Sequence, residues 1–107
     1  MTIKLTEIEI VPVRPNKGLV AFASFILNDS FFIGDVAIYT RIDQPGYRLV
    51  YPVRYLVTGL RVHCFKPIHK PVADEIENQV SGYYEKLIEK AKKTEGTIQD
   101  DRLSETD

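Results

Sequence analysis

Residues 19–27, LVAFASFIL, constrain the fold more than any other segment, because they are apolar at every position but one. Side chains of a β-strand alternate between its two faces, so both faces of this segment are apolar, with Ser24 as the polar exception. Such a strand usually lies in the centre of a sheet and is covered on both sides. The fold of this chain must therefore supply cover for two faces of one sheet.

Segments on both sides of this strand also have strand patterns. Residues 3–14 alternate apolar and polar positions, and residues 31–41 are rich in aromatic and β-branched residues. The short segments between these strands, PNKG and NDS, have the composition of tight turns. The three strands therefore predict an antiparallel meander.

Shorter strands are expected next in the chain. Pro45-Gly46 predicts a turn before RLVYPVR, a strand that Pro52 breaks or confines to a sheet edge, since proline donates no backbone hydrogen bond. Gly59 predicts a further reversal before the short strand RVHCF. We therefore expect four to five strands in total.

The hydrophobic period changes after Pro71. Apolar residues from Val72 to Ala91, Tyr83 among them, recur at steps of three and four, which predicts an amphipathic helix that reaches Lys93. One such helix covers one face of a small sheet and leaves the other bare. We therefore expect an α+β fold, a mostly antiparallel sheet with one C-terminal helix packed on it, in a homodimer that covers the second face. A strongly curled sheet is the monomeric alternative.

Charge is distributed unevenly along the chain. Residues 94–107 contain five acidic residues and one arginine, begin near the helix-ending signal of Gly96, and are expected to form a flexible acidic tail. The whole chain carries −1 and this tail −4, so the domain of residues 1–93 carries +3. Residues 44–73 contain no Asp or Glu but five Lys or Arg and both histidines, so positive charge is concentrated there.

This acid-free segment contains the candidate site. Lysine and arginine side chains bind phosphates, arginine also reads guanine, and aromatic rings stack on unpaired bases, which indicates a nucleic acid as partner. The alternative is that these residues are solvent-facing strand positions and that the lysines prevent edge-to-edge pairing of strands. The candidate residues for nucleic-acid binding are Arg54, Tyr55, Arg61, His63, Lys66 and Lys70, with Tyr51 and Phe65 as further stacking candidates.

The sequence does not indicate a catalytic or metal site. Cys64 is the single cysteine and is expected in the core, and with two histidines it leaves too few ligands for a zinc site. His63 and Cys64 are adjacent on a strand, so their side chains point to opposite faces and form no nucleophile–base pair. Asp35, after Gly34, is expected to accept hydrogen bonds at a β-bulge rather than to act as a catalytic acid. We expect no metal, no cofactor and no enzymatic activity.

The sequence also predicts the compartment. No apolar run approaches the roughly 20 residues of a membrane span. The first ten residues, MTIKLTEIEI, are too acidic for a signal peptide. We expect a cytoplasmic protein without a membrane partner.

A series of short motifs extends over residues 6–90. They are Val11 with Val13-Arg14, Gly18, AFAS, FIGDV, Pro52 with Arg54, KPI at 66–68, and Ile76, Val80 and Tyr84. Their order and spacing resemble the SpoVG family of bacteria, the stage V sporulation protein G or putative septation regulators. The resemblance implies a small dimeric α+β protein that binds DNA and RNA and regulates gene expression, including in sporulation, septation and cell division. Tyr55 stands where that family has a second basic residue, and Lys66 where it has a histidine.

We therefore expect a non-catalytic regulator that binds DNA or RNA as a homodimer. One alternative is a protein-interaction module in which an exposed strand edge around YPVRY pairs with a partner's strand, and a third is a small-molecule binder. Salt-dependent retention on a nucleic-acid column distinguishes the first function from the others, because phosphate contacts weaken as salt rises.

Overall fold

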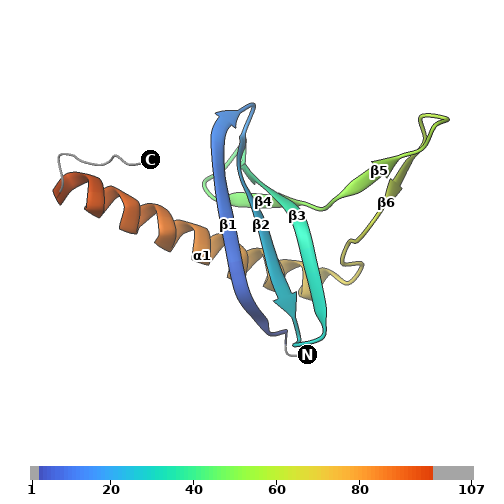
Figure 1. Cartoon of the computed structure of the whole chain (residues 1–107), viewed down its shortest axis with the longest axis horizontal. Helices are drawn as coiled ribbons and strands as arrows, with labels where there is room; N and C mark the ends of the chain where they lie inside the picture. Colours follow the sequence, from blue (N-terminus) through green and yellow to red (C-terminus); the bar gives the residue numbers. More distant parts are fainter. Residues whose placement is uncertain (1–2, 98–107) are drawn as a thin grey trace.

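A four-stranded antiparallel sheet forms the body of the protein. The computed structural model describes residues 3–97, with side chains described as far as Lys92. The strands are β1 (Leu5–Asn16), β2 (Leu19–Leu27), β3 (Phe31–Thr40) and β4 (Tyr47–Val50), and they follow one another across the sheet in chain order (Figure 1). The predicted meander is confirmed, and the doubly apolar strand β2 lies between β1 and β3 as expected.

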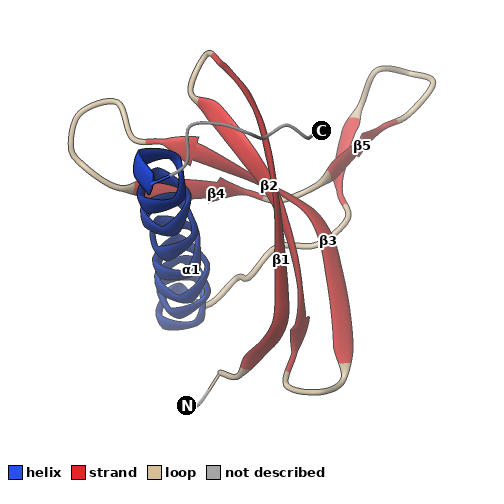
Figure 2. Ribbon diagram, turned by 60° about the vertical axis from the view of Figure 1, so that its left-hand side comes forward, coloured by secondary structure: helices blue, strands red, loops and turns tan. Residues whose placement is uncertain are grey.

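Helix α1 (Lys70–Thr97) packs on one face of this sheet (Figure 2). Its inward residues follow a four-residue step, so Tyr84 is buried while its neighbour Tyr83, predicted to face the core, is 43% exposed. The helix also continues past Lys93 and includes Gly96, so the first residues of the expected tail are helical, and residues 98–107 lie outside the described residues. The core consists of Ala21, Ala23, Phe25, Ile33, Val36 and Ile38 of the sheet and Ile76, Val80 and Tyr84 of the helix.

The face of the sheet that points away from α1 carries an uncovered row of apolar residues. Strand pairing places Val11, Phe22, Ala37 and Val50 side by side across the four strands, and on β2 and β3 this row alternates with core residues. Phe32 lies on the same side and is 72% exposed. We call these five residues the bare face. In Figure 2 no other described element covers it, so the helix covers only one face of β2, as predicted.

A β-bulge interrupts strand β3 at Gly34-Asp35. Ala23 pairs with Val36 and Phe25 with Ile33, so two residues of β3 oppose one residue of β2. Asp35 has a positive φ of 55° and an exposed side chain, which confirms the predicted bulge and leaves its carboxylate in solvent. A Cβ atom at Gly34 would lie 3.1 Å from the Phe32 ring, so glycine lets this ring lie against the backbone of the bare face.

Strands β5 (Val53–Tyr55) and β6 (Arg61–His63) form a second, two-stranded antiparallel sheet. Pro52 separates β4 from β5, so the predicted strand RLVYPVR is divided between the two sheets. Figure 1 shows this hairpin projecting away from the four-stranded sheet and from α1. We call residues 53–63 the arm.

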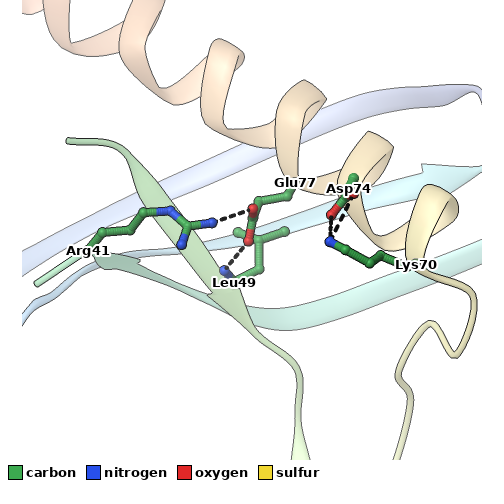
Figure 3. Close-up of polar contacts among 5 residues, drawn as sticks. All are labelled: Arg41, Leu49, Lys70, Asp74 and Glu77. Carbon is green, nitrogen blue, oxygen red and sulfur yellow. Dashed lines mark hydrogen bonds and ion pairs between the residues drawn. The ribbon is translucent and has the colours of Figure 1, made fainter. Parts of the chain in front are cut away.

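Polar contacts hold α1 against strand β4, the edge of the main sheet (Figure 3). Nη2 of Arg41 donates to Oε1 of Glu77 at 2.8 Å, and the backbone N–H of Leu49 donates to Oε2 of the same carboxylate at 3.4 Å. On the opposite edge, Nε2 of Gln79 donates to the carbonyl oxygen of Ile3 at 3.1 Å. Hydrogen bonds therefore join the helix to both edges of the meander. The arm lies between β4 and α1 in the chain, so each of its ends continues into one of these joined elements.

Candidate nucleic-acid interface

The register of the arm decides which of its side chains lie together. Arg54 pairs with Val62, Tyr55 with Arg61, and Val53 with His63. Because successive residues alternate between faces, Tyr55, Arg61 and His63 share one face of the arm and Arg54 lies on the other. The arm therefore presents an arginine on each of its two faces.

A short, hydrogen-bonded loop closes the tip of the arm. The N–H of Leu56 donates to the carbonyl of Leu60 at 2.8 Å, and the N–H of Gly59 donates to the carbonyl of Leu56 at 2.8 Å. Gly59 has a φ of +91°, a conformation that glycine adopts without steric cost. This loop exposes two aliphatic side chains to solvent, because Val57 is fully exposed and Leu60 is 61% exposed.

Sequence reasoning missed these two tip residues. Loops at reversals are normally rich in Gly, Pro, Asn, Asp and Ser. The segment LVTGL instead places three aliphatic residues around a predicted turn at Gly59, and this departure is the signal from which an exposed apolar tip could have been predicted.

The arm arginines are not paired with acidic groups. Within residues 3–92, neither Arg54 nor Arg61 takes part in an ion pair. The chain also has no Asp or Glu from residue 44 to residue 73, which includes the whole arm. Both guanidinium groups are therefore available to an external anion such as a phosphate.

The two candidate lysines lie outside the arm. Lys66 is exposed in the segment between β6 and α1. Lys70 is the first residue of α1, and its Nζ lies 3.2 Å from Oδ2 of Asp74 in an exposed pair (Figure 3). Of the six candidate residues, the fold thus brings Arg54, Tyr55, Arg61 and His63 together on the arm, while Lys70 already has an acidic partner.

Only one of the three stacking candidates is accessible. Tyr51 and Phe65 are half-buried and pack against each other, with ring centroids 5.5 Å apart and planes at 59°. The hydroxyl of Tyr51 is buried without a hydrogen-bond partner among the described residues. Burial, and to a smaller extent the Glu77 carboxylate, raise the pKa of Tyr51 to about 12. Tyr55, in contrast, is 67% exposed and can meet a base.

Cys64 is exposed, so the prediction that it lies in the core was wrong. Strand β6 ends at His63, and neither face of the arm is covered by another layer. Phe65, the next residue along the chain, packs against the core, whereas the Cys64 side chain stays in solvent.

The described residues contain neither a metal-ligand cluster nor a membrane-spanning helix. No group of three His, Cys, Asp or Glu side chains among residues 3–92 is placed to hold a metal ion. Over its described length, α1 is not apolar enough to cross a membrane. A hollow of about 280 Å³ lies between β1 and the second half of α1, lined by Pro12, Tyr84, Leu87, Ile88, Ala91 and Lys92, and it has Lys92 as its one charged group.

Comparisons with known proteins do not assign the chain to a family. Neither the models of known protein families nor the curated proteins include a match to it. The resemblance to the SpoVG family therefore stays a prediction that rests on the motifs quoted above.

Proposed function

We propose that this protein is a non-catalytic, nucleic-acid-binding regulator of the SpoVG type that acts as a homodimer in the cytoplasm. The observation that carries the proposal is the arm, which extends into solvent with two unpaired arginines and an accessible tyrosine. Polyanions release counterions when such groups bind their phosphates, and this release drives association. The motif resemblance adds the expected role, regulation of gene expression in sporulation, septation or cell division.

A salt titration tests the proposal directly. Binding of labelled DNA and RNA is measured by fluorescence anisotropy at several salt concentrations, and log affinity is plotted against log salt. We expect Arg54→Ala and Arg61→Ala each to flatten this slope by about one unit, because each removes about one phosphate contact. Arg14→Ala is the matched control, since Arg14 is an exposed arginine on β1, outside the arm. Unchanged affinity and slope in both arm variants would contradict nucleic-acid binding by the arm.

One observation favours a second function. The arm is a sheet of only two strands, so each strand has one unpaired edge to which an extended peptide of a partner protein can add. Such strand addition depends on backbone hydrogen bonds and has little salt dependence. A partner that binds the arm with the same affinity at low and high salt would favour this protein-interaction function.

A further inference from the structure

The placement of arginines on both faces of the arm has a geometric consequence, which rests on the proposed function. A ribbon that lies flat on a phosphate backbone needs cations on one face only. A ribbon that enters a groove between two phosphate walls needs them on both. Arg54 on one face and Arg61 on the other match the second arrangement.

The dimensions of the arm agree with entry into a groove. The major groove of B-form DNA is about 12 Å wide and 8.5 Å deep and admits a two-stranded β-ribbon. A strand rises by about 3.3 Å per residue, so the four steps from Val53 to Val57, which lies in the turn, span at most about 13 Å. The arm is therefore long enough for its tip to reach the floor of the groove while its base stays outside.

We infer that the arm enters the major groove of duplex DNA tip first, with Arg54 toward the phosphates of one wall and Arg61 toward those of the other. The tip, with Val57 and Leu60 exposed, then lies against the base edges. The floor of this groove carries the methyl group of thymine, which is an apolar partner for such side chains. The absence of carboxylates from residues 44–73 leaves nothing on the arm to repel either wall.

The same geometry selects DNA over double-stranded RNA. The major groove of A-form RNA is deep and too narrow for side chains to read. The arm therefore cannot enter the major groove of duplex RNA as it enters that of duplex DNA. Contact with single strands would instead use the exposed ring of Tyr55 as a stacking surface on one face of the arm.

Groove-specific competition tests the route of entry. Wild-type protein is bound to a labelled duplex, and methyl green, a major-groove ligand, or netropsin, a minor-groove ligand, is added. We expect methyl green to displace the protein, netropsin not to do so, and a duplex RNA of the same sequence to bind at least tenfold more weakly. Displacement by netropsin alone, or equal affinity for duplex RNA, would overturn the inference.

Charge removal on each face separates the inference from the proposed function. Arg54→Gln and Arg61→Gln are each expected to flatten the salt slope on duplex DNA by about one unit, and the double variant by about two. If only one of the two variants changes the slope, the arm lies flat and the inference fails, although nucleic-acid binding stands. If wild-type protein shows no salt-dependent binding to any nucleic acid, the proposed function itself fails.

Thymine methyl groups test the position of the tip. Affinity is compared for an alternating A·T duplex and the same duplex with uracil in place of thymine. We expect the affinity of wild-type protein to fall about fourfold when a contacted methyl group is removed, and the affinity of Leu60→Ala to fall little. Ile68→Ala, at an exposed apolar residue outside the arm, is the control and should respond as wild type does. An equal response of Leu60→Ala and wild type would place the tip away from the groove floor.

Discussion

Glu77 holds helix α1 against the edge of the sheet with both oxygens of one carboxylate. One oxygen accepts from Arg41 and the other from the backbone N–H of Leu49 in the edge strand β4. Unpaired N–H groups on an edge strand otherwise invite pairing with another chain. Both side chains of this ion pair are about one-third exposed or less, whereas the pair of Lys70 and Asp74 is mostly in solvent.

This difference in burial predicts a difference in stability. Glu77→Gln should lower the free energy of unfolding by about 1–2 kcal/mol. The substitution removes the negative charge that strengthens the hydrogen bonds from Arg41 and from the backbone N–H of Leu49. Asp74→Asn makes the same chemical change in the exposed pair and should alter stability by less than about 0.5 kcal/mol. Urea unfolding of the three proteins measures both values. Equal losses in the two variants would contradict a structural role for Glu77.

The raised pKa of Tyr51 predicts that the protein loses stability at alkaline pH. Its pKa is raised to about 12 in the folded protein from an ordinary value of 10.0, so the folded state holds this proton more tightly than the unfolded state does. The resulting stability is complete below pH 10 and is lost as pH rises toward 12. Tyr51→Phe removes this part of the alkaline loss.

The same substitution also removes a buried hydroxyl that has no partner among the described residues. At pH 7 the variant should therefore be as stable as wild type or more stable by up to about 1 kcal/mol. Urea unfolding at pH 7 and pH 11 measures both effects, with Tyr55→Phe on the exposed arm as control. A large loss in Tyr51→Phe at pH 7 would mean that the hydroxyl has a partner.

The arm is expected to differ from the rest of the fold in local stability. Two-stranded hairpins without a covering layer are marginally stable. The central strands β2 and β3 instead have Phe25 and Ile38 fully buried under α1. The arm and the body are therefore expected to open with different free energies.

Hydrogen exchange measures this difference. We expect the backbone amides of the arm, such as that of Val62, to exchange orders of magnitude faster than those of Phe25 and Ile38, because local opening of the arm breaks no core contact. Binding of a ligand to the arm would slow its exchange without affecting the core. Equal protection of arm and core in the free protein would show that another part of the assembly covers the arm.

Local sequence patterns predicted where the strands and the helix occur better than they predicted how these elements are arranged in space. Strand β2 has the predicted bounds because turn residues close its apolar run on both sides. Alternation of side chains, however, reports which way a residue faces and not whether another layer covers that side. For this reason the arm and the exposure of Cys64 were not predicted. The four candidates that meet on the arm were predicted from charge and residue type, but their division between two faces depends on register, which composition does not specify.

The chain as a whole is extended rather than compact. The Cα radius of gyration is 16.0 Å, against roughly 13 Å for a compact chain of this length. The bare face adds exposed apolar area, including Val11 at 63% and Phe32 at 72% exposure. Exposed apolar area of this kind commonly marks an interface, which supports the proposed homodimer.

Two matched substitutions test this dimer. Val11→Asp places a charge in the bare face at an exposed position, and it should convert the protein to a monomer in size-exclusion chromatography with light scattering. Val57→Asp makes the same change at the tip of the arm and should leave the oligomeric state unchanged. A wild-type protein that is monomeric at high concentration, or a dimer that survives Val11→Asp, would contradict assembly through the bare face.

The separation of the arm from the core also affects how such a protein can evolve. Substitutions among residues 53–63 change no packed contact of the four-stranded sheet, so selection for folding does not remove them. Related chains that share the sheet and helix can then diverge in the arm alone, and under the proposed function such divergence would change the nucleic-acid target.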